Sequence, residues 1–267
     1  MKLTDEQLQF YAENGYIVIK KVIPEEKIDS FLEYICYIIS LEAKNDSTIS
    51  NDFQILLNQG LIKIKQNYPS SNSWIYQTIN NSNEFKKFIF NSNVDSIAYQ
   101  LLGVDDMKKL AVVNPVLRID VPNDTKNKRD WHQESNYFND VKDGKNGVVV
   151  WMPFNDVSEK NGSVILCPGS HKEGSLNFTH ISGDSGKSEQ FLTPPEFVKK
   201  YDCISVICEA GDVVFFNVDL IHKSGDNSSN QVRYTTQIRF FRLDIPDYNP
   251  PISATNYQNY ERLASKT

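Results

Sequence analysis

The chain has 267 residues, of which 40% are hydrophobic, 12% aromatic and 23% charged. These proportions suit a globular protein with a sizeable core and exclude a fibrous or compositionally disordered chain. The formal net charge of −6 argues against a nucleic-acid partner bound through counterion release. No stretch approaches the roughly 20 apolar residues that span a bilayer, so we expect no membrane partner either.

The N-terminal hundred residues show mainly helical patterns. Thr4 and Gln7 form a capping box, and Gly15 is placed to end the first helix. The apolar residues 16–19 then predict a short strand, and Pro24 starts a second amphipathic helix. Further amphipathic stretches predict helices at 53–64, 72–80 and 84–102.

After Gly103 the chain changes to short apolar or alternating runs separated by Pro, Gly, Asn and Asp. Such runs predict the strands of a sandwich or barrel. We expect the polar stretch 181–189 to be a surface loop. The expected architecture is therefore a helical N-terminal layer on an all-β core. The predicted strands cover 111–119, 147–153, 163–167, 203–207, 212–217 and 233–241.

The four cysteines, Cys36, Cys167, Cys203 and Cys208, have irregular spacings. No CxxC pair occurs, so the spacing indicates neither a thiolate zinc site nor a disulfide framework. We therefore expect buried or half-buried thiols in a reducing compartment, and hence a cytoplasmic protein.

Among the four histidines, His132 stands in an HxE pair with Glu134. Residues two apart on an extended segment point to the same side, so the imidazole and the carboxylate can meet one metal ion. His222, after an apolar run in the same half, is a candidate third ligand. Two histidines and one carboxylate suit Fe(II) and leave adjacent positions open for a chelating co-substrate and O₂. We expect His171 and His180 to be structural and loop residues.

Arg233 follows His222 at the start of the last strand-like run. A guanidinium binds a carboxylate through two parallel hydrogen bonds, which is the chemistry that holds the far end of 2-oxoglutarate. A surface arginine in a salt bridge is the alternative. A non-redox metal hydrolase would use the same metal ligands but leaves Arg233 unexplained.

Several blocks of the chain, in order, closely resemble the phytanoyl-CoA dioxygenase family of double-stranded β-helix oxygenases. Arg233 falls where that family places its 2-oxoglutarate arginine. The opening residues, from Leu3 to Tyr16, are similar to the family's usual start. The other similar blocks are Trp131-His132-Gln133-Glu134, Val150-Trp151, Asn161-Gly162, Pro168-Gly169-Ser170-His171, Gly211-Asp212-Val213-Val214-Phe215-Phe216 and Ile221-His222-Lys223-Ser224-Gly225.

The resemblance implies a mainly β protein, a double-stranded β-helix (jelly-roll, cupin-like) with a helical N-terminal layer. We expect one oxygenase domain over 1–267, with helical support over 1–105, the β-helix core over 106–245 and a C-terminal tail over 246–267. The cofactors implied are Fe(II), 2-oxoglutarate as co-substrate, and O₂. The residues implied are His132, Glu134 and His222 for the metal, and Arg233, Gln133, Trp151 and Ser224 for 2-oxoglutarate.

Glu134 departs from the aspartate that is more usual in the family. Its extra methylene moves the carboxylate by about one bond, and oxygen ligation remains suitable for iron. Related halogenases replace this carboxylate with a small residue, so Glu134 argues against halogenation.

The implied activity is hydroxylation of an unactivated C–H bond of a small molecule, with release of succinate and CO₂. Desaturation or ring chemistry stays open. If Arg118 and Arg239 both point inward, the substrate is anionic; internal salt bridges or simple exposure are the alternatives. Tyr137 is a candidate pocket residue or a core aromatic. The alternative function is a catalytically silent metal-binding β-helix protein with a binding or sensory role. The sequence predicts no oligomeric state.

Overall fold

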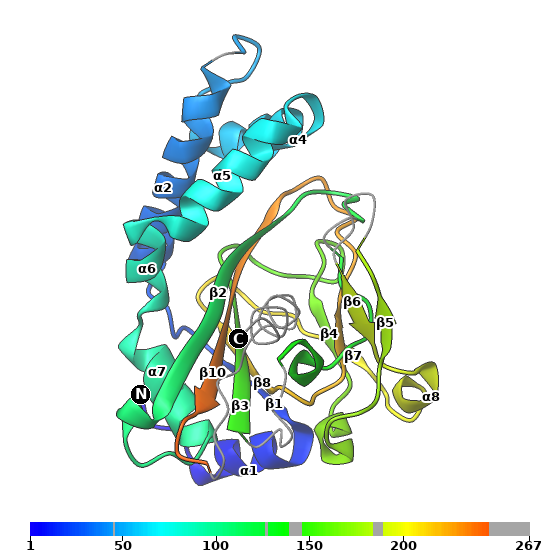
Figure 1. The fold of residues 1–267 in the computed structure, drawn as a ribbon. Helices are drawn as coiled ribbons and strands as arrows, with labels where there is room; N and C mark the ends of the chain where they lie inside the picture. The colour runs from blue at the N-terminus through cyan, green and yellow to red at the C-terminus, as the bar shows by residue number, and fades with distance from the viewer. Residues whose placement is uncertain (45, 126–127, 139–145, 184–188, 246–267) are drawn as a thin grey trace, which may run out of the picture.

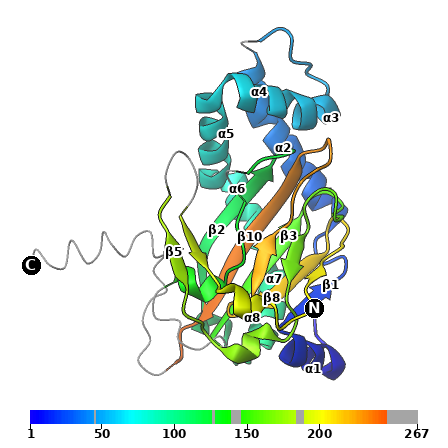
Figure 2. The same ribbon diagram turned by 90° about the vertical axis from the view of Figure 1, so that its right-hand side faces the viewer.

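The structure, a computed structural model, describes residues 1–44, 46–125, 128–138, 146–183 and 189–245. All of its strand pairs are antiparallel, and they form two main sheets and a hairpin (Figures 1 and 2). The large sheet, in the order β1-β8-β3-β10-β2, consists of β1 (Tyr16–Ile19), β8 (Val213–Asn217), β3 (Gly147–Pro153), β10 (Arg233–Arg242) and β2 (Leu110–Asp120). The small sheet, in the order β7-β4-β9, consists of β7 (Ile204–Ser205), β4 (Val164–Leu166) and β9 (His222–Ser224). The hairpin pairs β5 (Thr179–Ile181) with β6 (Gln190–Leu192).

Strand β3 shows why the large sheet is buried on both faces. Side chains alternate across a strand, so its seven residues, all of them buried, divide into two sets. Val148, Val150 and Met152 join the hydrophobic cluster that the helices complete. Val149 and Trp151 join a second cluster with side chains of the small sheet. The inner face of the large sheet therefore lines the space between the two sheets, where a jelly-roll holds its ligands.

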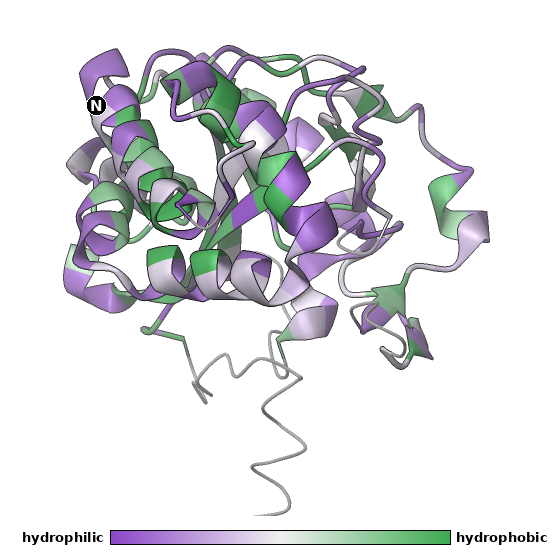
Figure 3. Cartoon of the chain, turned by 90° about the horizontal axis from the view of Figure 1, so that it is seen from above, coloured by the Kyte–Doolittle hydropathy of each residue, from purple (hydrophilic) through white to green (hydrophobic). Residues whose placement is uncertain are grey.

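The helical layer packs on the outer face of the large sheet, with α2, α5 and α6 on the side away from the small sheet (Figures 1 and 2). Seen from above, the helices in view carry both hydrophobic and hydrophilic residues (Figure 3), as expected for amphipathic helices that cover a sheet. The helices are α1 (Asp5–Asn14), α2 (Glu25–Ala43), α3 (Phe53–Ile55), a π-helical turn (Leu56–Gly60), α4 (Leu61–Asn67), α5 (Pro69–Asn81), α6 (Asn83–Ile89), α7 (Ser92–Leu101) and α8 (Pro195–Val198).

The start of the chain folds as the sequence predicts. Thr4 and Gln7 form the capping box of α1, and Gly15 ends the helix with a φ of 74°. The N-terminal segment does more than support the core, because β1 pairs with β8 in the large sheet. The jelly-roll fold is confirmed. Residues 246–267, the expected tail, lie outside the described residues, and the single-domain division stays a prediction.

The helix predicted at 84–102 is wrong as one element, because the chain forms α6 and α7 with a break at Phe90. Asn91 starts α7, and its side-chain oxygen accepts a hydrogen bond from the backbone N–H of Asn93. Asparagine favours such capping positions over helix interiors, which explains the break. The predicted loop 181–189 is also partly wrong, because Ile181 belongs to β5; residues 184–188 lie outside the described residues.

Two of the four cysteines are joined, which corrects the expectation of free thiols. Cys167 and Cys203 form a disulfide, whereas Cys36 and Cys208 are free. The disulfide removes the argument for a reducing compartment. The cytoplasmic location therefore stays a prediction. Within the described residues, no helix has both the length and the apolar character needed to cross a membrane.

Candidate metal centre and co-substrate pocket

Backbone pairing brings the two predicted histidine ligands side by side. The N–H of His132 donates to the carbonyl of His222 at 2.9 Å, and the N–H of His222 donates back at 3.0 Å. This antiparallel bridge directs both rings to the same side, with ring centroids 4.1 Å apart. Both residues are buried, at 5% and 3% exposed.

Hydrogen bonds to the backbone set the orientation of both imidazoles. Nδ1 of His132 lies 2.6 Å from the carbonyl oxygen of Asp130, and Nδ1 of His222 lies 2.9 Å from that of Leu220. A carbonyl oxygen accepts only, so each Nδ1 carries the proton and each Nε2 presents a lone pair. The same arrangement holds metal-binding histidines in one tautomer.

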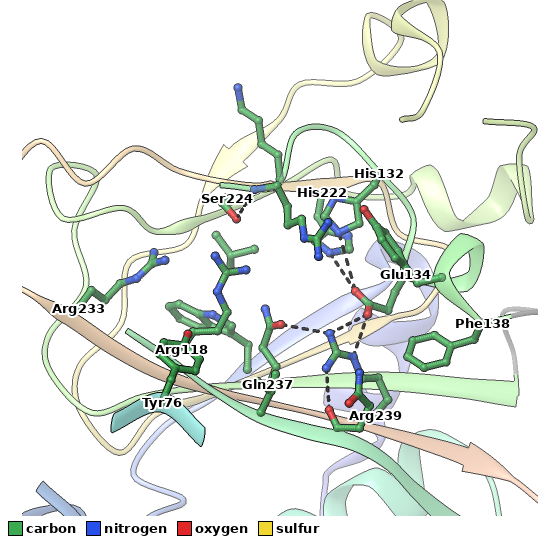
Figure 4. Close-up of a pocket in the computed structure, with 17 residues that line it drawn as sticks. Tyr76, Arg118, His132, Glu134, Phe138, His222, Ser224, Arg233, Gln237 and Arg239 are labelled. Carbon is green, nitrogen blue, oxygen red and sulfur yellow. Dashed lines mark hydrogen bonds and ion pairs between the residues drawn. The ribbon is translucent and has the colours of Figure 1, made fainter. Parts of the chain in front are cut away.

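Glu134 completes the triad from the start of a short 3₁₀ helix, Glu134–Tyr137. The expectation of an extended segment therefore holds only as far as Gln133. The Oε2 atom of Glu134 lies 3.8 Å from Nε2 of His132 and 3.7 Å from Nε2 of His222 (Figure 4). Its other oxygen, Oε1, accepts from Nε of Arg239 at 2.8 Å.

The three facing atoms fit a divalent cation. Their separations exceed hydrogen-bonding distance, yet two atoms that each bind one ion at about 2.1 Å can lie up to about 4 Å apart. One ligand atom from each of the three residues lies within 4.8 Å of the other two, so together they could hold a metal ion. A donor set of two imidazoles and one carboxylate suits Fe(II).

The protonation states also suit metal binding. Burial, together with the neighbouring His222 ring, lowers the pKa of His132 to about 4. Burial acts to raise the pKa of Glu134, but the Arg239 guanidinium and the two imidazoles outweigh burial and hold that pKa well below its usual value. At neutral pH His132 is therefore neutral and Glu134 ionised, as ligands must be.

A cavity of about 270 Å³ opens from the triad between the two sheets. This volume is slightly below the usual range of small-molecule pockets, which is about 300 to 1,000 Å³. It is lined by Tyr76, Asn114, Val116, Arg118, Arg129, His132, Glu134, Tyr137, Phe138, Trp151, Val164, His222, Lys223, Ser224, Arg233, Gln237 and Arg239. Figure 4 shows Arg233 and Arg118 on the side of the pocket away from the histidines.

Arg233 is 3% exposed, and its Nη2 donates to Oδ2 of Asp120 at 2.7 Å. Its Nε is buried and has no hydrogen-bond partner among the described residues. The guanidinium carbon lies 5.8 Å from the Trp151 ring centroid, so the indole forms a wall beside it. A side chain on Gly162 would approach Nη1 to 3.1 Å, and Gly162 has a φ of +91°, so glycine is required there.

The structure does not bring every predicted 2-oxoglutarate contact to the pocket. Trp151, Ser224 and Arg233 line it, but Gln133 does not. The Gln133 amide instead donates to the carbonyls of Gly174 and Asp219 at 2.8 and 2.6 Å. Neighbouring side chains on an extended segment point to opposite sides, so the side chain of Gln133 points away from that of His132.

The tentative substrate residues have different surroundings. Tyr137 lines the pocket, with its ring edge-on to His132 at 5.3 Å. Arg118 also lines it, and its Nη2 donates to Asp120 at 3.0 Å. Arg239 is bound to Glu134, so internal pairing, and not an open substrate contact, is its observed state.

Outside the pocket, His171 lies in a 3₁₀ helix, Ser170–Glu173, with Nε2 3.2 Å from the carbonyl oxygen of Ala12. Its position agrees with the structural role that the sequence suggests. His180 is in β5 and pairs with Glu189 at 2.6 Å, so it is a strand residue and not a loop residue.

Sequence reasoning missed Asp120, Arg129 and Tyr76. Asp120 had one available signal, since it stands two residues after Arg118 and therefore shares its side of β2. Arg129 and Tyr76 come from a loop and from helix α5, and no motif marks either residue.

Comparisons with known proteins agree with this geometry. The family model for phytanoyl-CoA dioxygenase (PhyH) matches residues 11–235. The peroxisomal phytanoyl-CoA dioxygenase of Homo sapiens is 24% identical over 268 residues, a match that covers 97% of this chain and 74% of the human protein.

Solved structures share the fold at low identity. The non-heme alpha ketoglutarate dependent carbocyclase SnoK has a TM-score of 0.59 and 20% identity, with 97% of this chain and 91% of SnoK covered. The epimerase SnoN, in complex with Fe3+, alpha ketoglutarate and nogalamycin RO, has a TM-score of 0.58 and 17% identity, with 93% and 92% covered. The family match spans most of the chain. The chain therefore belongs to the phytanoyl-CoA dioxygenase family of iron- and 2-oxoglutarate-dependent oxygenases.

Proposed function

We propose that this protein is an Fe(II)- and 2-oxoglutarate-dependent dioxygenase that hydroxylates an unactivated C–H bond of a small anionic molecule. The observation that carries the proposal is one pocket that joins a buried His-Glu-His triad to a buried guanidinium whose Nε has no partner within the described part of the chain. In the balanced reaction, the substrate C–H group, O₂ and 2-oxoglutarate give C–OH, succinate and CO₂. The bound iron supplies the activation of O₂ that is coupled to decarboxylation.

The residues divide the work between two ends of the pocket. His132, His222 and Glu134 would hold the metal, with both Nε2 atoms already directed at one point. Arg233 would bind the far carboxylate of 2-oxoglutarate, since no described residue partners its buried Nε and a charge-assisted hydrogen bond would satisfy it. Trp151 would fix the plane of that guanidinium and keep water away from it.

Charge supports an anionic substrate. The lining holds five cationic side chains, Arg118, Arg129, Lys223, Arg233 and Arg239, and one carboxylate, Glu134. Asp120 contacts two of the arginines and supplies a second negative charge. Doubly charged Fe(II) and doubly charged 2-oxoglutarate cancel one another, so the pocket keeps an excess of positive charge. An anionic group on the substrate would compensate it, because buried charges require partners.

Arg129 and Tyr137 are the substrate contacts that we propose near the metal. The Arg129 guanidinium carbon lies 5.2 Å from the Tyr137 ring centroid. That ring is in turn edge-on to His132, so the arginine stands close to the metal end of the pocket. Arg118 is the corresponding candidate at the far end.

The test is succinate formation by protein prepared without oxygen and then supplied with Fe(II), 2-oxoglutarate and O₂. Candidate substrates are offered as matched pairs, each a carboxylic acid and its neutral primary amide. We expect acids, and not their amides, to stimulate succinate formation, and His222→Ala to abolish it. Iron binding without 2-oxoglutarate binding or succinate would contradict the proposal and favour the silent metal-binding protein. Equal stimulation by acids and amides would contradict the anionic substrate alone.

A further inference from the structure

The side chain of Arg239 is fixed by three residues around it (Figure 4). Its Nε and Nη2 atoms contact Oε1 of Glu134 at 2.8 and 2.7 Å. Nη1 donates to the carbonyl of Asn114 at 3.0 Å, and Nη2 donates to Oε1 of Gln237 at 3.1 Å. Arg239 is only 7% exposed, so these contacts are made largely away from water.

The backbone of two strands is shaped to hold this guanidinium. Asn114 has a φ of 47°, a left-handed conformation that asparagine tolerates better than most residues. The pairing of β10 with β2 shifts register between Gln237 and Arg239, as in a β-bulge. Bulges redirect side chains next to functional sites. Here the register shift lies between Gln237 and Arg239 on β10 and faces Asn114 on β2. Gln237 and Asn114 are two of the residues that contact the Arg239 guanidinium.

The consequence for Glu134 is that its two oxygens have separate tasks. Oε1 is taken by the guanidinium, whereas Oε2 faces the Nε2 atoms of His132 and His222. A carboxylate that binds a metal through both oxygens fills two coordination positions. In an octahedral site with two histidines, that would leave two positions instead of three. Chelation by 2-oxoglutarate needs two positions, and O₂ needs the third.

We propose that Arg239 is a positioning residue that restricts Glu134 to one-oxygen coordination and so keeps three metal positions open. The inference rests on the metal site of the proposed function and explains how a glutamate, with one more rotatable bond than aspartate, can serve there. It also gives Arg239 a role toward the metal ligand in place of a role toward the substrate.

The test uses Mn(II) as the probe and counts the water molecules on the bound ion through water-proton relaxation. Wild-type protein is expected to show the relaxivity of an ion with three exchangeable waters. Arg239→Gln is expected to bind Mn(II) within about tenfold of wild type, but its relaxivity per bound ion should fall by about one third as one water position is lost. Its dissociation constant for 2-oxoglutarate on the Mn(II) protein should rise about tenfold, because the chelate must displace a carboxylate oxygen.

Arg242→Gln is the matched control, since Arg242 is on the same strand but pairs with Asp244 at the surface. It should keep the wild-type values. Wild-type relaxivity in Arg239→Gln would overturn the inference, and so would a folded variant that no longer binds Mn(II). A wild-type relaxivity that corresponds to only two waters would also overturn the inference, whether or not Arg239→Gln folds. Wild-type protein that binds no Mn(II) would instead contradict the proposed function.

Discussion

At the metal end of the pocket one carboxylate, Glu134, faces one guanidinium and two imidazoles. At the far end one carboxylate, Asp120, is shared by two guanidinium groups, those of Arg118 and Arg233. Burial acts to raise the pKa of Asp120, but the two arginines outweigh it and hold that pKa well below its usual value. Each end buries an ionised carboxylate, but Glu134 is paired with one arginine, whereas Asp120 is paired with two.

This difference separates two ways of recognising a ligand. At the metal end the charges of Glu134 and Arg239 balance each other, so the triad selects its ion by the directions of three lone pairs. The far end selects by charge, because a second anion is needed to balance its two arginines. The following changes test this division, from the largest expected effect to the smallest.

Removing a lone pair should eliminate function. His222→Ala and His132→Ala are each expected to abolish iron binding and succinate formation, since two remaining ligands hold a metal poorly. Equilibrium dialysis with Fe(II) under nitrogen measures the binding. His171→Ala, which alters a histidine outside the pocket, is the control and should bind iron as wild type does. Retained iron binding in His222→Ala would remove His222 from the site.

Removing the shared carboxylate should destabilise the far end. Asp120→Asn removes the carboxylate that the buried Arg233 and the half-buried Arg118 share, and breaking such a buried pair costs about 3–5 kcal/mol of unfolding free energy. Urea unfolding measures the loss. Saturating 2-oxoglutarate should restore more stability to this variant than to wild type. An equal effect of 2-oxoglutarate on both proteins would contradict the charge surplus.

The metal end should respond to pH in metal-free protein. Unfolded His132 takes up a proton near pH 6.5, whereas the folded residue does so only near its pKa of about 4. The unfolded state therefore binds more protons in this interval, and stability falls as the pH drops from about 6.5 to about 4. The loss from this residue is at most about 3 kcal/mol. Urea titrations at several pH values should show a shallower loss in His132→Asn; an unchanged slope would assign the effect to other groups.

Removing the Arg233 guanidinium should change the affinity for 2-oxoglutarate more than the rate of the reaction. Arg233→Ala removes a charge-assisted hydrogen bond worth about 1.5–3 kcal/mol, so the KM for 2-oxoglutarate should rise roughly 10- to 150-fold. The kcat at saturating co-substrate should change little, because Arg233 supplies affinity for 2-oxoglutarate and takes no part in the reaction itself. Initial rates of succinate formation over a range of 2-oxoglutarate concentrations measure both. Unchanged co-substrate dependence would reassign Arg233.

Local patterns in the sequence predicted most helices and strands, the metal triad and Arg233. They did not predict the contacts that depend on the register between strands. Cys167 and Cys203 illustrate this limit. The pairs Ile165–Ser205 and Leu166–Ile204 of β4 and β7 lead directly to these two cysteines as the next pair, and their Cα atoms are 4.2 Å apart. Nothing in the cysteine spacing reveals that register.

The pocket shows the same limit. The alternation expected from His132 to Glu134 holds only from His132 to Gln133, and it turns the Gln133 side chain away from the pocket, although the family resemblance had suggested a co-substrate contact. The pairing of Arg239 with Glu134 depends on a bulge and on the backbone of Asn114, neither of which a sequence pattern predicts.

The most direct test of the two-ended pocket is a crystal structure of the protein with Mn(II) and 2-oxoglutarate, with the metal located by its anomalous scattering. We predict one metal peak bound by His132, His222 and one oxygen of Glu134, and the far carboxylate of 2-oxoglutarate on Arg233. A metal bound by other residues, or 2-oxoglutarate with its far carboxylate away from Arg233, would contradict the account.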